Sequence, residues 1–260
     1  TEYIALCKEV SEAIAYLAKN KGNVDKDVLL SQYGNFVRTC AATQQQVLDA
    51  LKMPAKAQRI LNAYWCYLGV DAKRLNFTIY AVMLYVYLEK GAYIPRLRSH
   101  ALSMALEQTI RAMGGIVELN SAAEQILIEN GSVIGVKTAR GEYIKTSQVL
   151  ANMSQHMVYS NLLYPKNAIP SRGYQLTNAR VVSPSAMVVY AGLNKSVEEL
   201  GVKDYEFFIY DSMNTTDSYR SFSSRGRTAV QATVFQNVII PDCSPAGTCI
   251  MSITTLHHGS

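Results

Sequence analysis

Residues 91–163 carry the pattern that most limits how this chain can fold. Ser99 is a good N-cap for an amphipathic helix, and Gly114–Gly115 gives that helix a natural end. Asn130–Gly131 predicts a tight turn between two apolar, β-branched runs. The strands expected after the helix are residues 116–119, 123–129, 133–138, 142–146 and 148–152. This order of helix, turn, strand and hairpin predicts a domain that mixes helices with a sheet.

Residues 1–90 are expected to be helical. Tyr3 begins an apolar stripe with helical spacing that continues to Leu17. Thr43, followed three residues later by Gln46, predicts a capping box at the start of another helix. Beyond the first helix, the expected helical segments are residues 28–38, 47–53, 55–68 and 71–89.

The longest apolar run in the chain extends from Phe77 to Leu88 and has 12 residues. A membrane-spanning helix needs about 20 residues, so this run predicts a buried or interfacial helix instead. Its aromatic side chains could line an apolar pocket or pack as helix core. Aromatic stripes at helical spacing usually pack, and we favour the core interpretation.

The last third of the chain, from Pro165, has a β-rich pattern. The expected strands are residues 186–193, 206–210, 229–234 and 248–255, with a short helix at 196–200. Pro241, Pro245 and Gly247 mark the connection before the last strand. Together with the helical first third, this pattern predicts an α+β fold with a mainly antiparallel sheet.

Composition excludes several classes of protein. The 260 residues are 49% hydrophobic and 17% charged, which suits one or two ordinary globular domains. The net charge of +5 comes from scattered basic residues, so we expect no nucleic-acid partner. Five cysteines, with no CxxC or HExxH pattern, predict free thiols, no disulfide scaffold and no metal site. Free thiols fit the reducing cytoplasm.

The residues offer little catalysis by themselves. The four histidines have no neighbouring nucleophile arrangement, and no GxSxG elbow is present. Paired carboxylates on one helical face are also missing from the sequence. An enzyme with so few protein catalysts often relies on a cofactor for its difficult chemistry.

Four segments, taken in order, resemble the phytoene-dehydrogenase-like flavoproteins, which include carotenoid desaturases, carotenoid isomerases and retinol saturases. The matching segments are YIPRLRSHAL (93–102), the block from GGI to GV (114–136), VLANMS (149–154) and SPAGTCIMSITTL (244–256). Their order and spacing carry the resemblance, which is strongest over 91–163. It implies FAD as the cofactor and an apolar small molecule as the substrate.

The resemblance also implies a role for three residues toward the flavin. The backbone of Ala123 would contact the adenine of FAD, and Ala151 and Asn152 would lie close to the dinucleotide. No GxGxxG loop, which would bind the pyrophosphate, occurs in this sequence. We therefore expect an internal piece of a longer flavoenzyme, with an incomplete flavin site and no activity by itself.

Three further residues are implied toward the substrate: Tyr93, Arg98 and His100. The family usually carries Gly-Gly at the positions of Leu97 and Arg98, so the bulky pair is a departure from its pattern. Arg98 could hold a carboxylate or phosphate as a charge-assisted pair, or could be a solvated arginine at a helix start.

We predict three parts: a helical substrate-side region at 1–90, a partial FAD-binding segment at 91–163, and a β-rich substrate domain at 164–260. The longer protein is expected to transfer hydride between FAD and C–C bonds of an isoprenoid, carotenoid or lipid-like substrate. Two alternatives stay open: an amine-oxidase-like flavoprotein, and a stand-alone module that binds an apolar ligand without flavin. The expected location is cytoplasmic, with peripheral membrane contact and a homo-oligomer left open.

Overall fold

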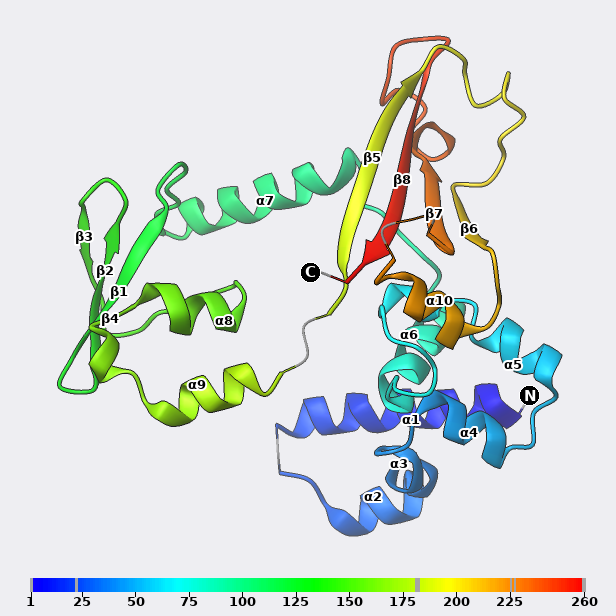
Figure 1. Ribbon diagram of the computed structural model, residues 1–260, viewed down its shortest axis with the longest axis horizontal. Coiled ribbons are helices and arrows are strands. Elements are labelled where there is room, and N and C mark those ends of the chain that lie inside the picture. Colours follow the sequence, from blue (N-terminus) through cyan, green and yellow to red (C-terminus); the bar gives the residue numbers. More distant parts are fainter. Residues whose placement is uncertain (1, 22, 181–182, 225, 227, 259–260) are drawn as a thin grey trace. The chain divides into compact units, whose positions relative to one another are not determined.

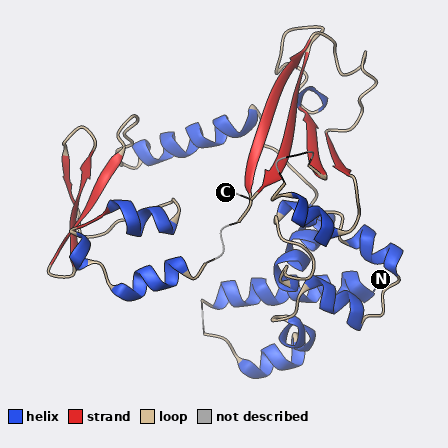
Figure 2. Cartoon of the chain, in the orientation of Figure 1, coloured by secondary structure: helices blue, strands red, loops and turns tan. Residues whose placement is uncertain are grey.

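The computed structural model describes residues 2–21, 23–180, 183–224, 226 and 228–258, which form two compact units (Figure 1). Unit 1 comprises Thr1–Ser99 and Ser183–Ser260, and unit 2 comprises His100–Val182. Both helices and strands are abundant, which confirms the predicted α+β class (Figure 2). The three-part division by sequence stays a prediction.

The first half of unit 1 is helical, and its helices pack around the first and the last of them. They are α1 (Glu2–Asn20), α2 (Lys26–Gln32), α3 (Gly34–Thr39), α4 (Gln44–Ala50), α5 (Ala55–Leu61), the 3₁₀ helix η1 (Trp65–Tyr67) and α6 (Phe77–Lys90). Tyr3 and Phe77 bring their ring centroids to 6.0 Å between α1 and α6, beside the buried Tyr80. One side of the apolar run of α6 is therefore helix core, as favoured from the sequence, while Ile79, Val86 and Leu88 are exposed. No helix among the described residues has the length and apolarity to cross a bilayer.

Side-chain caps set the start of two helices. The predicted capping box is present: the Thr43 hydroxyl accepts from the Gln46 N–H at 3.2 Å, and the Gln46 side chain accepts from the Thr43 N–H at 2.8 Å. Asn76 caps α6 with a single bond, in which its side-chain oxygen accepts from the Ile79 N–H at 3.3 Å. The helix predicted at 71–89 therefore begins only at Phe77.

Tertiary contacts break the other predicted helices. The segment 28–38 divides at Tyr33 because Glu9 of α1 accepts the N–H groups of Asn35 and Phe36, at 2.7 and 3.2 Å, and so starts a new helix. The segment 55–68 ends as α-helix at Leu61 and continues as η1. Neither the carboxylate cap nor the turn into η1 has a local sequence signal.

The second half of unit 1 contributes an antiparallel sheet. Its strands are β5 (Ser185–Leu193), β6 (Glu206–Tyr210), β7 (Val230–Phe235) and β8 (Cys249–His257), in the order β5-β8-β7-β6. These four strands confirm the predicted ones within one or two residues. The helix α10 (Thr215–Ser221) precedes β7, and the 3₁₀ helix η4 (Gln236–Val238) follows it. The helix predicted at 196–200 is a turn in the structure.

The strand register gives the sheet two different faces. Phe208 pairs with Ala232, which in turn pairs with Thr254, so these three side chains share one face. We call it the inner face because Val230 and Leu256, which it also carries, join the core of the helical part. The opposite, outer face carries the alternate residues of each strand.

Unit 2 combines helices with a small sheet of its own. Its elements are α7 (Arg98–Ala112, whose first two residues fall in unit 1), β1 (Ala123–Glu129), β2 (Ser132–Thr138), β3 (Tyr143–Lys145), α8 (Gln155–Met157), the π-helix η2 (Val158–Leu162), β4 (Leu163–Tyr164), η3 (Lys166–Ala168) and α9 (Ser171–Asn178). The strand order is β3-β2-β1-β4. Asn130 and Gly131 both have positive φ, 50° and 77°, which confirms the predicted hairpin turn.

Several predicted elements around this hairpin are wrong. Residues 116–119 and 148–152 are irregular, with Leu150 fully exposed, because no described strand pairs with them. The helices η3 and α9 were not predicted, because the sequence analysis described the chain from Pro165 only as β-rich and placed its first strand at 186. Ser99 lies inside α7, which begins two residues before the first position that an N-cap at Ser99 predicts.

A buried chain of hydrogen bonds links three elements of the helical part. The Tyr3 hydroxyl donates to Gln44 Oε1 at 2.9 Å, and Gln44 Nε2 donates to Asn62 Oδ1 at 2.9 Å. Gln44 has no exposed surface, so both of its polar atoms depend on these partners. The chain joins α1, α4 and the end of α5.

We expect Gln44→Leu to destabilise the fold, because it orphans the Tyr3 hydroxyl and the Asn62 amide oxygen at about 1–3 kcal/mol each. The measurement is urea unfolding followed by circular dichroism. Gln32→Leu is the matched control, because Gln32 is exposed and ends α2. Equal midpoints for the two variants would contradict the role of the chain.

Candidate functional site

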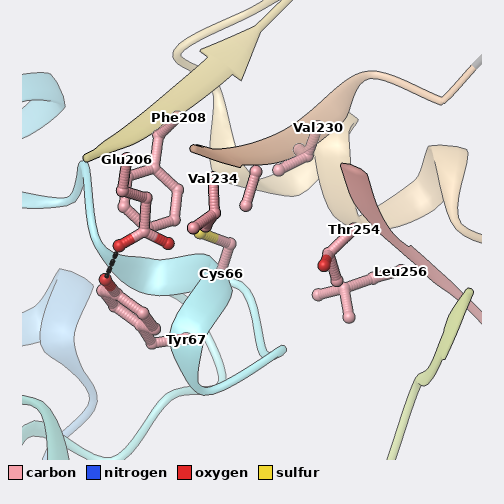
Figure 3. Close-up of a pocket in the computed structure, with 9 residues that line it drawn as sticks. Cys66, Tyr67, Glu206, Phe208, Val230, Val234, Thr254 and Leu256 are labelled. Atoms are coloured by element: carbon pink, nitrogen blue, oxygen red, sulfur yellow. Dashed lines mark hydrogen bonds between the residues drawn. The ribbon is translucent and has the colours of Figure 1, made fainter. Parts of the chain in front are cut away.

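An apolar pocket lies in unit 1 between the inner face of the sheet and η1 (Figure 3). Its volume is about 240 Å³. The residues that line it are Cys66, Tyr67, Glu206, Phe208, Val230, Ala232, Val234, Thr254 and Leu256. Two come from η1 and the others from β6, β7 and β8.

The register of the inner face creates the hollow. Ala232 stands at the centre of the sheet, between Phe208 on β6 and Thr254 on β8. Its methyl group is much smaller than the side chains of Val230 and Val234, its neighbours on the same face of β7. A small residue among larger ones leaves unfilled space in front of the strand.

One end of the pocket is polar. The Tyr67 hydroxyl donates to Glu206 Oε2 at 2.9 Å, as the dashed line in Figure 3 shows. Burial, and then the hydrogen bond to Glu206, raise the pKa of Tyr67, so the phenol stays protonated at neutral pH. The pair therefore offers a neutral hydroxyl and a carboxylate as partners for a polar group on a ligand.

The Cys66 thiol is held by its neighbours and is not an activated nucleophile. Its sulfur lies 3.2 Å from the oxygen of the Tyr210 hydroxyl. That hydroxyl donates its hydrogen to the carbonyl of Ala63. Burial raises the pKa of Cys66, which lowers the fraction of reactive thiolate. The pocket therefore supplies shape and apolar contact, while its residues supply no obvious covalent chemistry.

Aromatic rings support the wall of the pocket from behind. Phe208 meets Tyr67 edge to face, with ring centroids 5.0 Å apart. Tyr64 approaches Phe208 at 5.9 Å and Tyr87 at 5.3 Å. Such ring contacts fix the orientation of Phe208, so the pocket is preformed on this side.

The three residues implied toward the flavin lie in unit 2. Ala123 begins β1, where its Cα partner is Thr138 of β2. Ala151 and Asn152 lie in the exposed irregular segment after β3. Their contact with FAD stays a prediction.

The three residues implied toward the substrate surround the start of α7. Tyr93 is 87% exposed, and Arg98 and His100 are exposed in the first turn. None of the three is among the residues that line the apolar pocket. Their contact with substrate stays a prediction.

Sequence reasoning did not single out Cys66, Tyr67 or Glu206. The alternation of EFFIY could have placed Glu206 and Phe208 on one face of a strand. No sequence signal brings Tyr67 to that face, because the two segments are more than a hundred residues apart.

Leu97 and Arg98 have left-handed backbone, with φ of 65° and 73°. The Arg98 N–H donates to the Pro95 carbonyl at 2.9 Å, which closes a turn around Leu97. This conformation is the one that glycine favours. The backbone thus keeps a Gly-Gly geometry at the positions where the resemblance expects glycines, although the side chains differ.

We expect Leu97→Gly to stabilise the chain. The left-handed conformation costs a residue with a Cβ about 1–2 kcal/mol, while the added chain entropy of glycine costs about 0.5–1 kcal/mol. Leu102→Gly is the control, because Leu102 is similarly exposed but lies within α7, where glycine costs about 1 kcal/mol. Thermal unfolding should shift in opposite directions for the two variants, and a loss of stability in both would contradict the expectation.

The chain is similar to several characterised proteins. All-trans-retinol 13,14-reductase of Danio rerio is 23% identical over 239 residues, which cover 87% of this chain and 39% of the relative. A 4,4'-diapophytoene desaturase of a Methylomonas species is 28% identical over 152 residues, 54% of this chain and 29% of the relative. No model of a known protein family matches the chain.

The fold has a solved counterpart. The crystal structure of an oxidoreductase from Methanosarcina mazei superposes with a TM-score of 0.60 at 14% identity, over 91% of this chain and 53% of that one. The shared fold is α+β, and the antiparallel sheet of this chain carries the apolar pocket. The chain resembles the phytoene-dehydrogenase-like oxidoreductases, as its ordered motifs indicated, and these comparisons confirm that resemblance. The chain spans less than two fifths of the length of these relatives.

Proposed function

We propose that this chain forms the substrate side of an FAD-dependent oxidoreductase that transfers hydride between flavin and C–C bonds of an isoprenoid substrate. The observation that carries the proposal is the apolar pocket on the inner face of the sheet. The relatives named for retinol reduction and phytoene desaturation support a polyene or related isoprenoid as the substrate. By itself, the chain is expected to be inactive.

The size of the pocket restricts how such a substrate would bind. Whole-ligand sites usually have about 300–1,000 Å³, and this pocket has about 240 Å³. It would therefore hold one end of a long isoprenoid, with Phe208, Val234 and Leu256 excluding water around it. A substrate that ends in a hydroxyl could place it against the Glu206 carboxylate.

The residues of unit 2 fit the adenine side of FAD. Among the described residues, the first residues of β1 pair with β2 alone, because β4 pairs with β1 only at Ile126 and Leu127. On the side of β1 that faces away from β2, no described strand covers Ala123, whose small side chain is exposed. A ligand could therefore hydrogen-bond to the backbone there. Ala151 and Asn152 would complete this side. When bound, the flavin would accept or deliver the hydride.

We expect Ala232→Phe to weaken binding of retinol to the purified chain at least about tenfold, because the ring would fill the hollow. Enhancement of retinol fluorescence on titration is the measurement. Ala191→Phe is the matched control, because the register places Ala191 on the outer face of the same sheet. Equal affinity in the two variants would show that this pocket does not bind the ligand.

The enzymatic proposal is tested on the product isolated from its source cells with an antibody against this chain. We expect it to carry FAD, and its absorbance at the flavin band to change when retinol or phytoene is added without oxygen. Oxidation of amines with peroxide release would favour the amine-oxidase-like alternative. Extracted lipid without any flavin would favour the binding module and contradict an oxidoreductase.

A further inference from the structure

A second pocket in unit 1 has a different chemical character. It lies between α4, α5 and the turn that enters α10, elements labelled on the right of Figure 1. Its residues are Gln45, Ala55, Gln58, Arg59, Asn62, Lys73, Met213, Asn214, Thr215 and Thr216. None of them lines the apolar pocket, and no carboxylate is among these described lining residues. We call it the polar pocket.

The buried hydrogen-bond chain fixes the direction of Asn62. The Tyr3 hydroxyl is buried and gives its hydrogen to Gln44 Oε1, so Gln44 must use its Nε2 as donor. Asn62 therefore presents its oxygen to Gln44, and its NH₂ group is left for the polar pocket. Asn62 is only 6% exposed, and within the described chain its NH₂ has no acceptor. The Asn62 NH₂ is not among the buried unpartnered polar atoms of the described residues, so it is accessible from the pocket and can donate to a ligand there.

A second buried donor, Thr215, lines the same pocket. The Thr215 hydroxyl oxygen accepts from the Ala72 N–H at 3.2 Å, and the residue is 8% exposed. Its hydroxyl hydrogen has no acceptor in the part of the chain that the structure describes. Asn62 and Thr215 thus direct hydrogen-bond donors into one space.

Two cations complete the polar pocket. Arg59 and Lys73 have no ion pair with any described carboxylate. The carboxylates nearby are already engaged. Asp49 accepts from the side chains of Gln45 and Gln58 at 2.9 and 3.2 Å, and Asp71 lies 3.7 Å from Arg74.

We propose that the polar pocket binds a phosphate group, either free or as part of a lipid head group. Arg59 and Lys73 would supply charge, while Asn62 and Thr215 would supply oriented neutral donors. Four donor groups suit an anion with several acceptor oxygens, and a guanidinium matches phosphate geometry well. The volume of about 170 Å³ is well above the roughly 10–15 Å³ that a single water requires, which leaves room for such an anion.

The test is thermal unfolding of the full 260-residue chain in inorganic phosphate, against sodium chloride at equal ionic strength. We expect a saturable rise in the unfolding temperature, as for any ligand that binds only the folded state. Arg59→Gln should weaken the apparent affinity at least about tenfold, because it removes a charge-assisted contact. Arg59 is exposed, so the variant should fold, and its unfolding temperature without phosphate verifies that.

The matched control is Lys56→Gln, which makes the same change of charge on the same helix outside the polar pocket. A second arm measures co-sedimentation with vesicles of phosphatidylcholine, alone or with an equal part of phosphatidic acid. The site is supported if Arg59→Gln loses phosphate stabilisation or vesicle binding while Lys56→Gln keeps it. Loss of phosphate stabilisation would identify free phosphate as the ligand, and loss of vesicle binding would identify a lipid head group. Absence of both effects in the unmodified chain, or the same loss in both variants, would overturn the proposal.

Discussion

The packing of the sheet on η1 is the contact on which the apolar pocket depends. Trp65 stacks on Phe222, with ring centroids 5.6 Å apart and planes at 16°. The Tyr210 hydroxyl reaches back to the carbonyl of Ala63, next to Cys66. These contacts join residues more than 140 positions apart and hold the inner face against the helices. Without them, the hollow at Ala232 would be open sheet surface.

The two pockets of unit 1 differ in what their walls offer to a ligand. In the apolar pocket, burial keeps Tyr67 and Cys66 protonated, so the walls contribute shape more than reactivity. In the polar pocket, the hydrogen-bond chain from Tyr3 through Gln44 uses the Asn62 amide oxygen, which leaves the Asn62 NH₂ available to a ligand. The same helical core thus produces one site suited to isoprenoid carbon and another suited to an anion.

Local signals in the sequence were sufficient for much of the fold. The capping box at Thr43, the hairpin turn at Asn130 and the four strands of the larger sheet follow from short-range patterns that the backbone must obey. The apolar runs at 116–119 and 148–152 looked equally like strands, yet they are irregular. A strand requires a partner, and pairing is decided by the rest of the fold.

The sequence by itself determined the fold class, the family resemblance and the apolar character of α6, because these depend on composition, periodicity and ordered motifs. Only the tertiary structure brought Glu206 to Tyr67, and Thr215 to Arg59 and Asn62. It also showed that Leu97 and Arg98 keep the backbone of a glycine pair. Pockets arise where distant segments fail to fill space or to satisfy a donor, and that depends on three-dimensional packing, which no local pattern encodes.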